Sequence, residues 1–112
     1  FKAARKIEAD DRLDMAKAER DAVSSANPRV AAGAADVNFS MGNWDKAISL
    51  YDLALTKAGV DANRQTMRRG IAKLNKGDIA GAKADMETVS TDSGTRGEIA
   101  KLWLAYLNGK GA

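Results

Sequence analysis

The stretch from Met41 to Leu55, MGNWDKAISLYDLAL, decides the fold of this chain. Its Gly42-Asn43 pair predicts a short turn, and a helix is expected to begin directly afterwards. Apolar residues in this helix recur at spacings of three and four, which places them on one stripe of an amphipathic helix. The stripe consists of Trp44, Ala47, Ile48, Tyr51, Ala54 and Leu55. Because small alanines bracket the large Tyr51, the helix is expected to press closely against neighbours on two sides.

Turn-forming and capping residues divide the rest of the chain into further helices. Asn27, Asp61 and Asp78 are expected N-caps, because their side chains can accept hydrogen bonds from the backbone N–H groups that a helix start leaves free. Gly59 and Gly77 fall where helices commonly end in a left-handed residue. These signals predict helices over residues 2–24 (in one piece, or broken near Asp10-Asp11), 28–41, 44–58, 62–76, 79–90 and 95–108.

Two of these helices carry a predicted apolar face that we expect to pack on neighbouring helices. Over residues 28–41 the face holds Val30, Ala31, Ala34, Ala35, Val37, Asn38 and Met41, with Phe39 towards its edge. Over residues 95–108 it holds Ile99, Leu102, Trp103, Tyr106 and Leu107.

The composition predicts an all-α protein. The chain has 112 residues, which suits one domain, and 22 of them are alanine, the strongest helix former. Cysteine and histidine are absent. This excludes disulfides and thiolate chemistry, and it removes the commonest general base and transition-metal ligand. The net charge of +3, from 18 basic and 15 acidic residues, does not by itself indicate nucleic acid as a partner.

The sequence around Gly42 recurs one helical hairpin later. Gly42-Asn43-Trp44-Asp45-Lys46-Ala47 aligns with Gly77-Asp78-Ile79-Ala80-Gly81-Ala82 at an offset of 35 residues. The same offset aligns Tyr51 with Met86, Ala54 with Val89, Ala35 with Gly70, and Phe39 with Leu74. Gly111 follows 34 residues after Gly77, and the packing positions before it fall on Ala100, Trp103, Leu104 and Leu107. Such self-similarity is typical of stacked helical hairpins.

A helix–turn–helix unit of about 34 residues with a glycine at the turn resembles the tetratricopeptide repeat. The first unit, residues 28–61, matches that family at Gly42, Trp44, Ala47, Tyr51 and Ala54. The second unit, residues 62–95, matches at Gly70, Gly77, Ala82 and Met86, and departs from the family at Lys73. The resemblance implies that residues 28–112 form an all-α, right-handed superhelix of antiparallel hairpins, with residues 96–112 as a capping helix. Residues 1–27 lie outside it and are expected to form a charged N-terminal helix or a linker to an upstream part.

The resemblance also implies a concave side, lined by the first helix of each hairpin, on which relatives hold a peptide or a partner's helix. The candidate contacts there are Arg29, Asp36, Phe39, Arg64, Arg68, Ile71 and Lys101. Arg64 and Arg68 share a helix face, and in one interpretation they hold an acidic partner. In the other interpretation they belong to a solvated face, and Asp36 can pair with a basic residue and neutralise part of the site. Phe39 and Ile71 either line apolar pockets or belong to the core.

The last predicted helix carries an apolar group formed by Leu102, Trp103 and Tyr106. Because no further helix follows in the repeat, this group is a candidate interface with a dimer partner, with the N-terminal helix or with a further C-terminal segment. Trp44, in contrast, is interpreted as a packing residue between helices.

The leading hypothesis is therefore a non-catalytic scaffold, not an enzyme, that binds a peptide or helix of a partner protein. The alternative is structural self-association through the terminal helices. No cofactor is expected, and no metal either, because Glu8, Asp10, Asp11 and Asp14 lack the glycine and the oxygen spacing of a calcium loop. One short basic helix is a poor footprint for nucleic acid, and no apolar run reaches the roughly 18 residues of a membrane span. We expect a soluble chain in the cytoplasm or, after removal of an upstream signal, in the periplasm.

Overall fold

The structure is a computed structural model that describes residues 16–110, and helix is the only regular secondary structure in that range. The helices are residues 16–24, α2 (Pro28–Ser40), α3 (Trp44–Leu55), α4 (Ala62–Lys76), α5 (Ile79–Val89) and α6 (Thr95–Lys110). The all-α prediction is confirmed. The helix predicted over residues 2–24 is confirmed from residue 16 onwards. Residues 2–15, and with them the choice between one helix and two with a break near Asp10-Asp11, lie outside the described residues.

The three predicted N-caps are confirmed by side-chain hydrogen bonds. The Asn27 carboxamide oxygen accepts from the N–H of Arg29 at 3.0 Å. Asp61 and Asp78 accept in the same way from the first turns of α4 and α5, at 3.3 and 2.9 Å. Gly77 ends α4 with a φ of 100°, in the left-handed region that favours glycine.

The end of α3 differs from the prediction. This helix stops at Leu55 and not at residue 58, and its C-cap, Thr56, is right-handed. The Thr56 hydroxyl donates to the Leu53 carbonyl at 2.6 Å and so satisfies one of the carbonyls that the last turn leaves free. Gly59 does have a left-handed backbone, with a φ of 78°, but it lies in the loop that follows and does not cap the helix.

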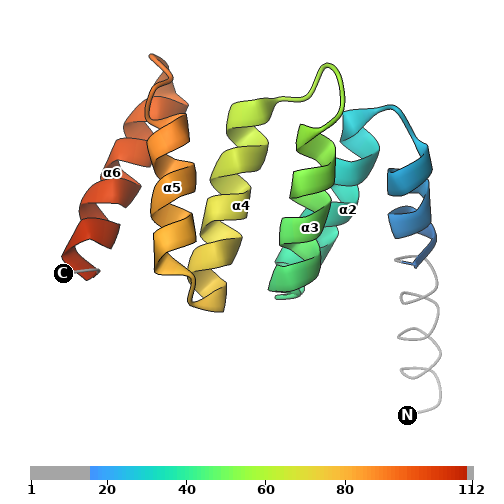
Figure 1. Cartoon of the computed structure of the whole chain (residues 1–112), viewed down its shortest axis with the longest axis horizontal. Coiled ribbons are helices and arrows are strands. Elements are labelled where there is room, and N and C mark those ends of the chain that lie inside the picture. Colours follow the sequence, from blue (N-terminus) through green and yellow to red (C-terminus); the bar gives the residue numbers. More distant parts are fainter. Residues whose placement is uncertain (1–15, 111–112) are drawn as a thin grey trace, which may run out of the picture.

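The helices stand in a row in chain order and alternate in direction (Figure 1). From α2 onwards each helix packs against the next one in the chain, and α4 also contacts α6. α2, α4 and α6 therefore run parallel to one another, and α3 and α5 run antiparallel to them. The N-terminal helical segment, residues 16–24, and α6 lie at opposite ends of the row.

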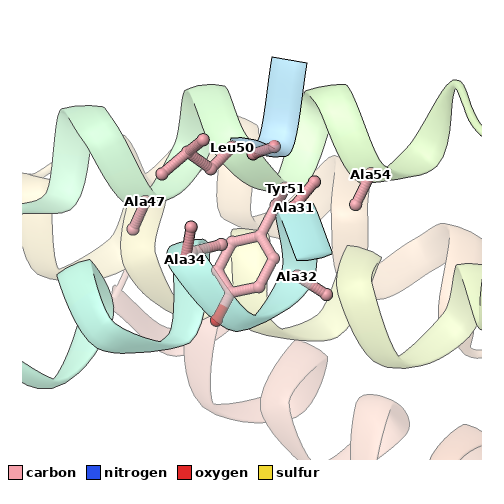
Figure 2. Packing of buried hydrophobic residues seen from close by; sticks show 9 residues of the cluster. Ala31, Ala32, Ala34, Ala47, Leu50, Tyr51 and Ala54 are labelled. Carbon is pink, nitrogen blue, oxygen red and sulfur yellow. The ribbon is translucent and has the colours of Figure 1, made fainter. Parts of the chain in front are cut away.

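The first hairpin has a core of small residues around one large side chain. Tyr51 of α3 is fully buried among alanines of α2 and α3, which allow the two helices to approach closely (Figure 2). Leu50 is also buried in this core, although it does not belong to the predicted stripe of α3. The core consists of Ala22, Ala31, Ala32, Ala34, Ala35, Ala47, Leu50, Tyr51 and Ala54.

The second core joins α4, α5 and α6. Its buried members are Ala82, Met86, Val89, Ala100 and Leu107. α4 and α5 cross at Gly70, where a methyl group would lie 3.0 Å from Cβ of Asp85 and 3.1 Å from the terminal carbon of Met86. This contact explains why the alignment places glycine here and alanine, Ala35, at the same position of the first hairpin.

The predicted apolar face of residues 28–41 is wrong at Val37 and Met41, which are both exposed. At the corresponding positions of the later units, Ala72 on α4 and Leu107 on α6 are buried. Helices α4 and α6 each follow a complete helix. In the described part of the chain, α2 is preceded only by the short segment 16–24. Nothing there covers the C-terminal end of its upstream side.

The predicted apolar face of α6 is divided by the structure. Leu107 is buried and Trp103 is half-buried, whereas Ile99, Leu102 and Tyr106 are exposed. The side that packs on the second core instead carries Ala100, Trp103, Leu104 and Leu107, as the repeat alignment predicted. Among the described helices α6 packs on α4 and α5, and its apolar residues Ile99 and Leu102 stay largely exposed.

Candidate functional site

α4 carries five basic residues and no acidic one, and all five are paired with carboxylates inside the chain. The pairs are Arg64–Asp36 (2.8 Å), Arg68–Asp36 (3.9 Å), Arg69–Asp52 (2.7 Å), Arg69–Asp85 (2.7 Å), Lys73–Asp85 (3.1 Å) and Lys76–Asp45 (2.5 Å). The carboxylates come from α2, α3 and α5. Carboxylates of the neighbouring helices therefore largely balance the positive charge of α4. The ion pairs with Asp36, Asp45 and Asp52 also connect α4 to the first hairpin.

Asp36 of α2 is the centre of one of these clusters. It accepts hydrogen bonds from the Tyr51 hydroxyl at 2.6 Å and from Nη2 of Arg64 at 2.8 Å. Burial of the phenol, reinforced by the neighbouring Asp36, raises the pKa of Tyr51, and the hydrogen bond to Asp36 raises the pKa of the Arg64 guanidinium. The prediction that Asp36 can pair with a basic residue is confirmed.

Arg68 lies between this cluster and an aromatic pair. Its guanidinium carbon is 5.3 Å from the centroid of the Phe39 ring, within the range of a cation–π interaction. Phe39 in turn meets Trp44 edge to face, with ring centroids 5.3 Å apart. The half-buried Phe39 is therefore covered by side chains of this chain and is not an open apolar pocket.

The second cluster surrounds Asp85 of α5, which is almost completely buried. Arg69 donates to both carboxylate oxygens of Asp85, at 2.7 and 3.0 Å, and Lys73 approaches the same carboxylate at 3.1 Å. The hydrogen bond to Asp85 raises the pKa of the Arg69 guanidinium. Sequence reasoning missed this network. The sequence did contain a sign of this network. Asp85 aligns with Leu50, which is a buried position, and basic residues occupy packing positions of α4.

The structure brings α2, α4 and α6 together on one face, which we call the first-helix face. At its N-terminal end, between α2 and α4, a polar hollow of about 390 Å³ contains three of the predicted contacts, Arg29, Asp36 and Arg64. The guanidinium of Arg29 has no ion pair with any described residue. It is therefore the cation of this hollow that is open to a ligand.

A second, apolar hollow of about 590 Å³ lies at the other end of the first-helix face, between α4 and α6. It is lined by Leu74, Asn75, Ile99, Leu102, Trp103 and Tyr106. The indole of Trp103 and the ring of Tyr106 meet edge to face, with centroids 6.1 Å apart. The three residues that the sequence singled out as an interface, Leu102, Trp103 and Tyr106, thus lie together in one hollow.

Four predicted contacts line neither hollow: Phe39 and Arg68, which contact each other, and Ile71 and Lys101. Ile71 is half-buried and packs on the second core. Lys101 is exposed on α6, and helical geometry turns it by about 140° from Tyr106, so it lies on a different side of α6 from the apolar hollow.

The described residues offer little else with chemical function. No group of three acidic, cysteine or histidine side chains between residues 16 and 110 could hold a metal ion, and Glu8, Asp10, Asp11 and Asp14 lie outside that range. None of the helices in this range is long and apolar enough to cross a membrane. Comparisons with protein-family models, with curated proteins and with solved structures found no match to this chain.

Proposed function

We propose that this chain is a non-catalytic, tetratricopeptide-like module that binds a peptide or a helix of a partner protein on its first-helix face. Two features support the proposal. The hairpins α2–α3 and α4–α5 repeat the same small-residue contacts in register, as stacked hairpins of this class do. The charged clusters outside the hollows connect helices to one another, and the chain has neither histidine nor cysteine for catalysis.

The observation that carries the proposal is the apolar hollow between α4 and α6. Leu102, at its rim, is 73% exposed, and burial of a leucine side chain stabilises a complex by about 1.5–3 kcal/mol. Exposed apolar groups gathered in one hollow mark interaction sites more often than scattered ones do. We therefore infer that apolar side chains of the partner supply most of the affinity.

The arginines of α4 have a smaller role in this proposal than the sequence suggested. Arg64 and Arg68 already share Asp36, so a ligand carboxylate would compete with an internal one. Arg29, which has no such partner among the described residues, is the better candidate to meet an acidic side chain of the ligand. This contact would be exposed and would weaken with increasing salt.

Selection of helical peptides from a phage-displayed library on the immobilised 112-residue chain supplies ligands without knowledge of the natural partner. For a selected peptide, Leu102→Glu should lower the affinity at least about tenfold, because the lost apolar burial exceeds the roughly 1.4 kcal/mol that corresponds to one decade. Fluorescence anisotropy of the labelled peptide measures this change.

The matched control is Val23→Glu, which makes the same type of change at a valine that is 70% exposed at the opposite end of the row. This variant should bind the peptide as the wild type does. Equal affinities of the wild type and the Leu102→Glu variant would contradict the proposal. Arg29→Gln should weaken only ligands with acidic residues, and only at low salt. Changing Arg64 and Arg68 to Glu is a poor probe, because it would gather three carboxylates around one site.

A further inference from the structure

The apolar hollow between α4 and α6 follows the length of α6. The residues that line it from α6 are Ile99, Leu102, Trp103 and Tyr106. They lie three, four and seven positions apart, so they share one stripe of the helix. This stripe covers two turns, or about 10 Å along the helix axis. A ligand that fills the hollow therefore lies along α6, because a segment that crosses the helices meets only about one turn of each.

α4 runs parallel to α6 and supplies the other wall of the hollow. Leu74 and Asn75, in the last turn of α4, line this wall. Two neighbouring helices leave a groove between them into which the side-chain ridge of a third helix can pack. The shape of the hollow therefore suits a helix.

The lining of the hollow offers few hydrogen-bond partners to the backbone of a ligand. None of the six lining residues is charged, and their polar side-chain groups are the Asn75 amide, the Trp103 indole N–H and the Tyr106 hydroxyl. An extended peptide would bury part of its N–H and C=O groups against these walls, and such groups cost free energy unless they are paired. A helix has already paired these groups within itself. The chemistry of the lining therefore also favours a helical ligand.

Charges of opposite sign flank the hollow. On α6, Glu98 lies four residues before Leu102 and so on the same face. It is exposed and has no ion pair with a described residue. On α4, Arg68 lies two turns before Asn75 on the same stripe. The Arg68 side chain is 41% exposed, and its distance of 3.9 Å from Asp36 is at the limit of an ion pair.

We propose that the apolar hollow takes an amphipathic helix of the partner, which lies along α4 and α6, and not an extended peptide. This choice of ligand rests on the proposed function of the first-helix face. The apolar stripe of the partner helix faces the hollow, an acidic residue at one edge of the stripe meets Arg68, and a basic residue at the other edge meets Glu98. Because reversal of a helix exchanges its two edges, the opposite charges also set the direction of the partner helix.

Selection from a phage-displayed library of linear random peptides tests the proposal, because such a library imposes no conformation. The peptides have 16 residues, the length of α6, and are selected on the immobilised chain. Selected sequences should carry apolar residues three and four positions apart. In the complex, the carbon-13 shifts of the Cα atoms of a labelled peptide should be those of a helix.

Two substitutions in a selected peptide distinguish a helix from an extended chain. Proline at a central position that faces solvent should lower the affinity at least about tenfold, because it breaks a helix. Alanine at the same position should leave the affinity unchanged or raise it. For a peptide that Leu102→Glu prevents from binding, Cα shifts of an extended chain, or equal affinities of the proline and alanine peptides, would overturn the helical ligand and leave the proposed function in place. Peptides that bind the Leu102→Glu variant as tightly as the wild type would contradict both.

Charge reversal tests the two flanks. Glu98→Lys should weaken a peptide with a basic residue at the α6 edge of its stripe by about two- to fivefold, because the contact is exposed. Reversal of that peptide residue to glutamate should restore the affinity. Glu87→Lys, the same change at an exposed glutamate of α5, is the control and should bind like the wild type. Equal affinities of the Glu98→Lys variant and the wild type at low salt would overturn the assignment of the charged edges.

A second copy of the chain is the other ligand that the hollow could take. Sedimentation equilibrium of the wild type and of Leu102→Glu distinguishes the two cases. We expect both to stay monomeric at the concentrations at which the peptide binds. A mass that rises with concentration for the wild type and not for Leu102→Glu would mean that a second copy fills the hollow, and it would overturn the proposal. Circular dichroism of each variant verifies that its helices are intact.

Discussion

The buried carboxylate of Asp85 offers the sharpest test of how the two hairpins are held together. Its side chain is 5% exposed and accepts two hydrogen bonds from Arg69, at 2.7 and 3.0 Å, while Lys73 lies 3.1 Å away. Asp85→Asn keeps the shape of the side chain and removes its charge, so Lys73 loses its counter-charge and Arg69 loses one of two. Breaking a buried pair in this way costs about 3–5 kcal/mol. Because Arg69 retains Asp52, we expect a loss near the lower end, about 3 kcal/mol.

Equilibrium urea unfolding, followed by the far-ultraviolet circular dichroism of the helices, measures this loss. The control is Asp52→Asn, which removes the other carboxylate partner of the same Arg69. The Asp52 side chain is 55% exposed, and exposed pairs of this kind contribute at most about 1 kcal/mol. The reasoning is refuted if Asp85→Asn stays within 1 kcal/mol of the wild type, or if the two variants lose the same amount.

Four further substitutions test local features of the fold. Gly33→Ala should stabilise the chain by about 1 kcal/mol, because alanine favours helix and nothing lies within 4 Å of the added methyl, whereas Gly70→Ala should destabilise it by up to about 2 kcal/mol through overpacking against α5. Thermal unfolding of both should therefore show shifts of opposite sign. Tyr51→Phe should cost about 1.5–3 kcal/mol in urea unfolding, because it deletes a hydrogen bond to a carboxylate; a loss below 0.5 kcal/mol would argue against that bond. Desolvation alone would raise the pKa of Asp61, but the hydrogen bonds from Arg96 and from the N–H of Arg64 lower it below 3.8. Its stabilising contribution is thus present above pH 3.8 and lost as the pH falls through the folded-state pKa; NMR titration of the carboxyl carbon should show the low value, and Arg96→Gln should raise it.

The helix boundaries could be predicted from the sequence where a local side chain determines them. Asn27, Asp61 and Asp78 cap helices with their own carbonyl or carboxylate oxygens, so the signal lies within three residues of the helix start. The end of α3 depends on the Thr56 hydroxyl, which satisfies a backbone carbonyl. The sequence predicted a later end because Gly59, a residue type that commonly ends helices, follows further along the chain.

The candidate site was harder to predict because it depends on which helices become neighbours. The sequence shows that α4 carries basic residues but not what they pair with. Only the packing of α4 against α2, α3 and α5 shows that carboxylates balance them. The exposure of Val37 likewise depends on which helices lie beside α2, and no described helix covers the C-terminal end of its upstream side. The grouping of Leu102, Trp103 and Tyr106 was predictable, since one turn of a single helix holds them together.

The most direct test of the proposed function is to locate a bound peptide by NMR. A peptide selected on the 112-residue chain is titrated into isotope-labelled protein, and the backbone amide shifts are followed. The apolar hollow predicts that the largest changes fall on Leu74 and Asn75 of α4 and on residues 99–106 of α6. Changes confined to the outward sides of α3 and α5, with none in that hollow, would contradict binding on the first-helix face.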